Sequence, residues 1–401
     1  MNSLRLACLA LFLAAAGPLL SAGSLGDVFE KGTVSLNARL RYEGAQQTNL
    51  RAADALTLRT RLGFTTAPWQ GLTAMVEGEH LVAADGDGYS QAGLNPAATG
   101  RAVVADPETS EINQVFFAYT SGKTTASLGR QRLVLDNARF VGDVGWRQNM
   151  QTFDAFVVQD KTLAQTTLTY GYLDQINRVF GARHAQGKWP SDSHVLHASY
   201  TGLGAGTLTG YAYLLDFAQT AAANSCATYG ASFAGTQPIH AAVTFAYRAE
   251  LGTQSDYGAS PLNYSTTYTA VSAGLVMKPG ALTLGYEQLG SDHNVGFKTP
   301  LATLHAFNGW ADLFLSTPAA GLQETYVRAT ANLPEAIALT ASYSHFETAV
   351  GGTKLGQEFN AQLSRKFGKS VTGLLKFARF RRDSLSVPNV QKIWAQVEFA
   401  H

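Results

Sequence analysis

The chain has 401 residues, with 30 Lys and Arg against 29 Asp and Glu, and only 15% of its residues are charged. This balance excludes a strongly basic nucleic-acid-binding protein and an acidic tail, so no nucleic-acid partner is expected. The 46% of hydrophobic residues excludes an intrinsically disordered chain.

Residues 1–22 have the pattern of a secretory signal peptide. Arg5 precedes an apolar run, Leu6–Leu20, and small residues follow up to Ala22. The run is shorter than the ~20 residues that a helix needs to cross a membrane, so we expect cleavage near Ala22 rather than an anchor. Cleavage leaves Cys226 as the only cysteine, which excludes an intrachain disulfide and a thiolate metal cluster.

From residue 32 onward the chain reads as a series of β-strands. The segment 32–44 alternates between an apolar face and a polar face, which is the period-two pattern of a strand, and 54–66 repeats it. Similar segments continue to the end of the chain and bring the total to about 18 strands: 72–82, 110–120, 124–133, 150–159, 163–173, 193–201, 206–216, 226–234, 240–250, 266–276, 281–290, 322–332, 336–346, 355–367, 370–380 and 390–400.

The connections between these strands alternate between long and short. The long ones include 83–109, 134–149 and 291–321, whereas short ones such as APWQG (67–71) and GTQP (235–238) are rich in turn residues. Short periplasmic turns and long outer loops are typical of outer-membrane barrels. A soluble β-sandwich would not explain a full set of apolar faces beside faces that carry arginine and glutamate, whereas a barrel turns the first to lipid and the second to a wet lumen.

We therefore predict an all-β fold: a transmembrane antiparallel β-barrel of about 18 strands, formed by residues 23–401 after a cleaved signal peptide. The three long loops are expected to be extracellular or folded into the lumen. Its partners are then membrane lipids and lipopolysaccharide. The last strand, 390–400, resembles the terminal strands that the barrel-insertion machinery reads in other outer-membrane proteins.

Enzyme motifs are missing from the sequence. It has no G-x-S-x-G elbow, P-loop, H-E-x-x-H or C-x-x-C motif. ADGDG (84–88) is similar to a calcium loop but lacks the bidentate acid at the required spacing, so a polar loop is favoured. We expect no catalytic residue, no metal site and no cofactor.

Three segments resemble the alginate-export family of outer-membrane porins: DALTLRTRLGFTT (54–66), GRQRLVLDNARFVGDVGWRQNMQTFDA (129–155) and GYEQLGSDHNVGFKTPLATLHAFNGWADLFLSTPAAGL (285–322). The resemblance implies an 18-stranded barrel, a lumen narrowed by inward-folded loops and passage of anionic or polar solutes. It does not establish alginate as the solute.

Two groups of residues are candidates for the pore. The two long loops hold charged and aromatic residues that would form a constriction, and these loops either select solutes or only brace the barrel: Arg130, Arg132, Arg139, Asp143, Arg147, Trp310 and Asp312. The lumen wall has a second group, which is either a charge-balanced ladder or an anion-attracting strip: Arg39, Arg41, Arg59, Arg61, Glu77 and Glu79. We expect Arg39 to lie opposite Arg59, with Glu77 and Glu79 near Arg61 and Arg59.

The sequence thus predicts a channel in the outer membrane of a Gram-negative bacterium, through which polar and anionic solutes diffuse. Two alternatives are a non-selective general porin and a structural or surface-binding barrel with a plugged lumen. An enzyme built on a barrel comes last, because it needs a nucleophile, a base and an orienting group on adjacent strands.

Overall fold

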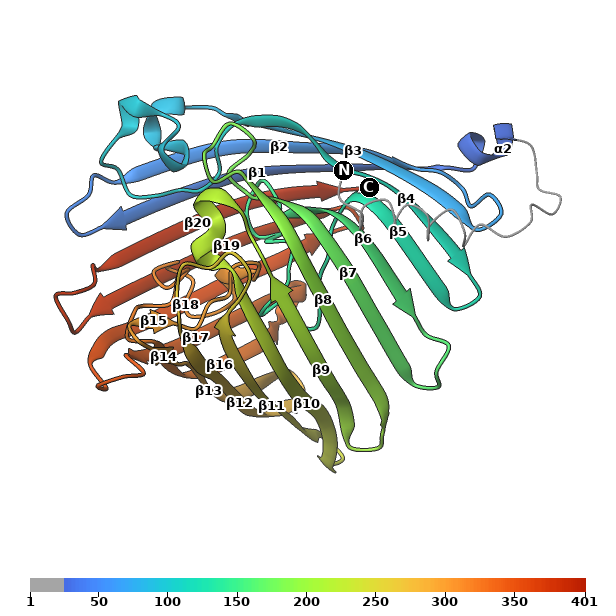
Figure 1. The fold of residues 1–401 in the computed structure, drawn as a ribbon. Helices are drawn as coiled ribbons and strands as arrows, with labels where there is room; N and C mark the ends of the chain where they lie inside the picture. Colours follow the sequence, from blue (N-terminus) through green and yellow to red (C-terminus); the bar gives the residue numbers. More distant parts are fainter. Residues whose placement is uncertain (1–24) are drawn as a thin grey trace.

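A computed structural model describes residues 25–401, which form one closed antiparallel barrel (Figure 1). The predicted signal peptide lies outside the described residues. Within the described part of the chain, a short helix, α2, leads into 18 barrel strands: α2 (Leu25–Glu30), β1 (Thr33–Gln47), β2 (Ala53–Thr65), β3 (Leu72–Ala83), β4 (Thr109–Ser121), β5 (Thr124–Gln131), β6 (Thr152–Asp160), β7 (Thr166–Asn177), β8 (Lys188–Leu203), β9 (Gly206–Leu215), β10 (Cys226–His240), β11 (Val243–Asp256), β12 (Ser265–Met277), β13 (Gly280–Leu289), β16 (Leu322–Leu333), β17 (Ile337–Glu347), β18 (Lys354–Phe367), β19 (Val371–Arg382) and β20 (Val390–Ala400).

Each strand pairs with the next along the chain, and β20 pairs back onto β1. This last pairing runs from Asn37 opposite Ala400 to Gln47 opposite Val390. Closure leaves no strand edge with unpaired backbone groups, which is the condition for a sheet in a membrane. The predicted barrel is confirmed, and most predicted strands match the observed ones to within a few residues.

Several strand boundaries were predicted wrongly, and the largest differences are at the end of β10, the end of β11 and the start of β8. GTQP (235–238), expected as a turn, lies inside β10, and the turn follows at residues 241–242. Pro238 is tolerated there because a register shift follows it near the strand end, where a missing backbone N–H costs little. The strand expected from residue 193 begins at Lys188, so the loop before it is shorter than predicted.

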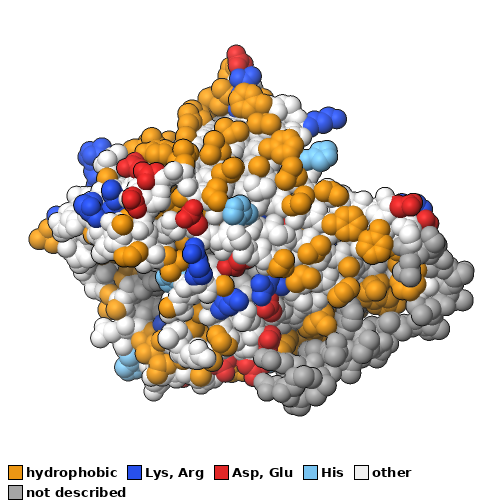
Figure 2. Space-filling view, turned by 90° about the horizontal axis from the view of Figure 1, so that it is seen from above, with side chains coloured by type: hydrophobic (Ala, Val, Ile, Leu, Met, Phe, Trp, Pro, Cys, Tyr) orange, Lys and Arg blue, Asp and Glu red, His pale blue; other side chains and the backbone are white. Residues whose placement is uncertain are grey.

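The alternation of faces is as expected. On β2, Leu58 and Leu62 are 41% and 59% exposed, whereas Arg59 between them is fully buried. Val397 on β20 is 53% exposed on the same outer surface. Figure 2 shows the molecule from above, where hydrophobic side chains cover broad areas between small groups of charged side chains. No helix within residues 25–401 is long and apolar enough to cross a membrane.

The long loops lie at one rim of the barrel and the short turns at the other (Figure 1). The β3–β4 loop, residues 84–108, forms three short 3-10 turns: η1 (Gly86–Gly88), η2 (Gln91–Gly93) and η3 (Pro96–Ala98). It covers the ends of β1 and β2, where Tyr89 and Val104 pack with Ala45 and Ala53.

Two loops fold from the loop rim into the lumen: the β5–β6 loop (132–151) and the β13–β16 loop (290–321). The second contains a small hairpin, β14 (Ser291–Asp292) with β15 (Val295–Gly296), and a 3-10 turn, η5 (Leu304–Ala306). The two loops contact each other through a parallel bridge between Val141 and Leu301.

These loops also bring their own apolar core into the barrel. The ring of Phe140 lies 5.1 Å from the ring of Tyr268 on β12 and 5.2 Å from the ring of Tyr211 on β9. Phe314 packs at 4.9 Å against Phe346 on β17. Burial of these aromatic rings against the inner wall holds both loops in the lumen.

Candidate solute channel

A buried ion-pair network joins both inward loops to the barrel wall. Arg147 of the β5–β6 loop contacts Glu43 of β1 at 3.0 Å and Asp312 of the β13–β16 loop at 2.5 Å. Lys392 of β20 lies 2.8 Å from the same Asp312 carboxylate. Burial raises the pKa of Asp312, but Lys392, His305 and Arg147 together hold this pKa well below its usual value. Asp312 is therefore ionised and fixes the loops as a charged group.

His305 continues the network toward β19. Its Nδ1 lies 2.6 Å from Oδ1 of Asp312, and its Nε2 lies 2.7 Å from Nζ of Lys376. Nδ1–H therefore donates to the carboxylate, and Nε2 accepts from the ammonium group. Burial, aided by Lys376, lowers the pKa of His305 to about 3, so this imidazole is neutral. It stacks on Trp146 with ring centres 4.4 Å apart.

Lys376 is enclosed by aromatic rings. Its Nζ lies 3.7 Å from the ring centre of Trp310 and 4.0 Å from that of Trp146. The backbone N–H of Trp310 donates to Glu358 on β18. Trp310 and Asp312, both predicted as constriction residues, thus belong to one network that runs through Lys376 and His305.

Arg139 attaches the tip of the β5–β6 loop to the opposite wall. Its guanidinium donates to both carboxylate oxygens of Glu287 on β13, at 2.7 and 3.1 Å, and to Asn308 at 2.9 Å. It also lies 4.7 Å over the ring of Phe307. Arg139 and Arg147 are both buried and paired, which supports the bracing alternative for these two arginines.

The other predicted loop residues form local pairs. Arg130 lies at the end of β5 and contacts Asp154 of β6 at 2.7 Å. Arg132 pairs with Asp143 inside the β5–β6 loop, and half of the Arg132 side chain stays exposed. Neither pair reaches the far wall of the barrel.

On the lumen wall, Arg39 lies directly opposite Arg59, as the sequence predicted. Their charges are answered by Glu398 of β20, at 3.1 Å from Arg39 and 3.3 Å from Arg59. Arg39 also donates to the backbone carbonyls of residues 145, 146 and 147, so it holds the β5–β6 loop against the wall. Glu398 was not predicted as the partner of these arginines, because only closure of the barrel brings β20 beside β1.

The acidic residues of β3 have different partners from one another. Glu79 pairs with Arg61 rather than with Arg59, because the β2–β3 register places Glu79 opposite Arg61. Glu77 instead accepts hydrogen bonds from Asn113 at 2.6 Å and Gln114 at 3.1 Å, both on β4. Arg41 donates to Gln396 and lies 4.2 Å over the ring of Trp146. The arginines of this wall are thus balanced by neighbours, as in the ladder alternative.

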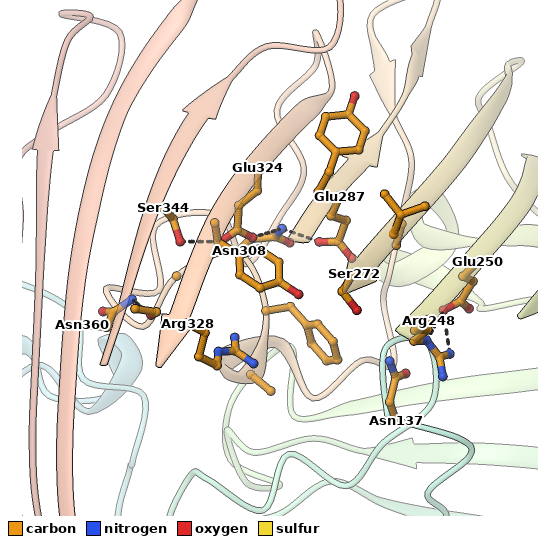
Figure 3. A pocket seen from close by; sticks show the side chains of 18 of the residues that line it. Asn137, Arg248, Glu250, Ser272, Glu287, Asn308, Glu324, Arg328, Ser344 and Asn360 are labelled. Carbon is orange, nitrogen blue, oxygen red and sulfur yellow. Dashed lines mark hydrogen bonds and ion pairs between the residues drawn. The ribbon is translucent and has the colours of Figure 1, made fainter. Parts of the chain in front are cut away.

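Below the loop tips, a cavity of about 300 Å³ opens against β11, β12, β13, β16 and β17 (Figure 3). Glu250 pairs with Arg248 at 2.7 Å, and Glu324 accepts hydrogen bonds from Ser344 at 2.7 Å and Asn308 at 3.1 Å. These contacts leave the carboxylates of this cavity satisfied.

Arg328 on β16 is the exception in this cavity. Its guanidinium faces the ring of Tyr326 at 5.2 Å, its Nε is buried without a hydrogen-bond partner, and it forms no ion pair with any residue in 25–401. Arg328 was not among the residues predicted for the pore, although it lies in the predicted strand 322–332. Mixed alternation in that segment hid which face the arginine occupies.

Comparison with known proteins identifies the fold. Pseudomonas aeruginosa OpdK, solved with vanillate, has a TM-score of 0.73 at 16% identity, over 93% of this chain and 99% of that chain. Pseudomonas aeruginosa OccK2 (OpdF), in complex with glucuronate, has a TM-score of 0.70 at 14% identity, over 93% and 99%. Acinetobacter baumannii OccAB4 has a TM-score of 0.72 at 12% identity, over 92% and 98%.

Neither the family models nor the curated proteins gave a match. The structural likeness supports a porin-type barrel and gives no support to the alginate-export family in particular. The fold of this chain is that of the 18-stranded porin barrels represented by OpdK.

Proposed function

We propose that this protein is a channel in the outer membrane of a Gram-negative bacterium, through which small polar solutes diffuse with a preference for organic anions. The fold supports a channel, because barrels of ~16–18 strands enclose an aqueous lumen rather than a filled core. Selection would come from the cross-section and the local field, without a cofactor or a catalytic step.

The observation that carries the anion preference is Arg328, which lines the cavity of Figure 3 without an ion-pair partner in residues 25–401. A single cation in a narrow, partly dry passage attracts anions far more than it would in a wide mouth. The constriction residues named above would then shape the passage by holding the loops, while Arg328 faces the solute. Vanillate and glucuronate, which the two Pseudomonas structures contain, are both carboxylates.

The alginate-export resemblance gives a narrower version of the same proposal. Alginate is a polymer of uronates, and a uronate carboxylate would suit Arg328 as well as any other small organic anion. The narrower version rests on the three sequence segments alone.

Lipid partners form a further part of the proposal. Arg379, Arg381 and Arg382 line a groove without an acidic residue at the loop rim of β19, where phosphate groups of lipopolysaccharide would find cations. Membrane lipids would cover the apolar outer faces, and the barrel-insertion machinery would read β20.

Planar-bilayer recording tests this function. We expect ohmic conductance and, under a KCl gradient, a reversal potential with weak anion preference. Arg328→Gln should move that potential toward cations, whereas Arg365→Gln, which removes an arginine paired with Glu335 at the short-turn rim, should not. A barrel without conductance would contradict the proposal and favour the plugged structural alternative. Equal shifts of the reversal potential in both variants would contradict the role of Arg328 in anion preference.

A further inference from the structure

A second cavity lies at the loop rim, apart from the one in Figure 3. Its volume is about 490 Å³, within the ~300–1,000 Å³ typical of small-molecule sites. The β7–β8 loop (178–187), the start of β8 and the β13–β16 loop provide most of its walls. It shares no lining residue with the cavity around Arg328.

Arg178 provides one cation to this cavity. Its guanidinium stacks 3.9 Å from the ring centre of Trp189 and 5.1 Å from that of Phe180. Its Nε is buried without a hydrogen-bond partner, and it forms no ion pair with another residue of the described chain. Burial alone lowers the pKa of Arg178 to about 10, with no carboxylate to offset the desolvation.

Lys298 provides a second cation. Gln254 fixes its backbone from both sides, since Oε1 accepts from the Lys298 N–H at 2.6 Å and Nε2 donates to the Lys298 carbonyl at 2.8 Å. Its Nζ lies 5.9 Å from the ring centre of Tyr264, and burial lowers the pKa of Lys298. Two partly desolvated cations thus line one cavity.

The remaining lining has no charge to answer them. No Asp or Glu is among the lining residues, and the accessible apolar surface comes from Leu262, Val295, Leu304 and Leu315. Buried cations without partners are costly, whereas an arriving anion would relieve that cost through charge-assisted hydrogen bonds.

We propose that this cavity binds a small organic carboxylate with an apolar body, such as an aromatic acid, at the outer mouth of the channel. The carboxylate would accept hydrogen bonds from Arg178 and Lys298. The apolar body would pack against the accessible apolar side chains of the cavity: Leu262, Val295, Leu304 and Leu315. Inorganic phosphate would use the cations but leave the apolar walls uncovered. This inference rests on the proposed function, because it makes the cavity the capture site before the narrow section.

Calorimetric titration of the folded barrel in detergent tests the site with three probes: benzoate, benzyl alcohol and inorganic phosphate. Benzoate should bind, and benzyl alcohol should bind at least tenfold more weakly, because it lacks the charge. Phosphate binding as tight as benzoate would overturn the role of the apolar walls. Equal binding of benzyl alcohol would overturn the role of the cations.

Two variants and a matched control locate the site. Arg178→Gln and Lys298→Gln should each weaken benzoate by about tenfold, the change that follows from losing one charge-assisted hydrogen bond. Arg183→Gln removes the same charge from the same loop, but this exposed side chain donates to the Glu108 carbonyl outside the cavity, so binding should not change. If Arg178→Gln does not fold, benzoate binding by Lys298→Gln still tests the site. Unchanged binding in Lys298→Gln would overturn the proposal.

Bilayer recording separates this inference from the channel itself. Arg178→Gln should lose the current fluctuations that benzoate causes on the loop side, whereas Arg183→Gln should keep them. A wild type that conducts but does not bind benzoate would refute only the capture site. Benzoate binding without conductance would refute the channel and leave the binding site supported.

Discussion

Arg147 and Asp312 join the two inward loops across the lumen: Nη2 of the arginine lies 2.5 Å from Oδ2 of the aspartate, although 165 residues separate them in the chain. Each partner also contacts the wall, through Glu43 and Lys392. This pair is therefore the point at which both loops and both terminal strands are held together.

Arg147→Gln should release the loops without unfolding the barrel. Removing one partner of a buried pair typically costs ~3–5 kcal/mol, and here Glu43 and Asp312 would be left to share Lys392. Single-channel recording should show larger conductance and more frequent transitions between levels, while the folded band in gel electrophoresis remains. Arg132→Gln breaks a pair whose arginine is half exposed, so it should change conductance little. Identical traces for Arg147→Gln and wild type would contradict the pinning role.

Loop closure should weaken as the pH falls from about 6.5 toward 5. The pKa of His305 is about 3 in the folded loop against ~6.5 when free, so the released loop binds a proton before the closed loop does. Above pH 6.5, His305 is neutral in both the closed and the released loop, so proton binding does not oppose closure. As the pH falls from 6.5 toward 3, protonation of His305 in the released loop increasingly favours opening. Asp312 has a lowered pKa, so its contribution is lost only at still more acidic pH. Noise recordings between pH 7 and 5 should show the effect, and His305→Gln should flatten it.

An arginine substituted on the lipid-facing side of the barrel should prevent folding, whereas one on the lumen side should be tolerated. Val271 lies in the middle of β12 and is 46% exposed. The side chain of the neighbouring Ser272 points to the opposite face of the strand, toward the lumen, because successive residues of a strand alternate between its faces (Figure 3). Val271→Arg should reduce the yield of folded, heat-modifiable barrel, since an arginine at the midplane costs ~2–4 kcal/mol. Ser272→Arg should fold, because it enters a polar cavity that contains three glutamates. Equal loss in both variants would contradict the assigned faces.

Thiol labelling should distinguish the two rims. Cys226 is fully buried, and Cys226→Ser leaves no thiol in residues 25–401. On intact cells, an impermeant reagent should label Leu385→Cys, which lies in the β19–β20 loop and is 85% exposed in the parent. Lys369→Cys, in the short turn before β19, should stay unlabelled until the outer membrane is opened. Labelling at position 369 on intact cells would invert the topology.

The wall of the barrel could be predicted because its pattern is local. Period-two alternation and turn residues define a strand within about ten residues, and the predicted segment 390–400 coincides with β20. GTQP failed because Gly and Pro mark a turn only when the strand has reached its end, and β10 continues for five residues beyond Gly235.

The charged site was harder to predict, since its contacts join distant parts of the chain. Neither the pairing of Arg139 with Glu287 nor that of Arg59 with Glu398 follows from spacing. The first pairing depends on how deeply the β5–β6 loop enters the lumen. The second depends on which strand pairs with β1 to close the barrel. The composition of the loops could be predicted, but the partner of each arginine needed the three-dimensional structure.

The seam between β1 and β20 differs from all other strand pairs in the distance it spans along the chain. Every other pair forms between consecutive barrel strands, so those contacts can develop hairpin by hairpin, whereas Asn37 and Glu398 meet across 361 residues. Closing a long loop carries an entropy cost that no local contact recovers before the ends meet. Assembly therefore has a single ring-closing event, and until it occurs the curved sheet keeps two open edges, which is the stage most exposed to pairing with another chain.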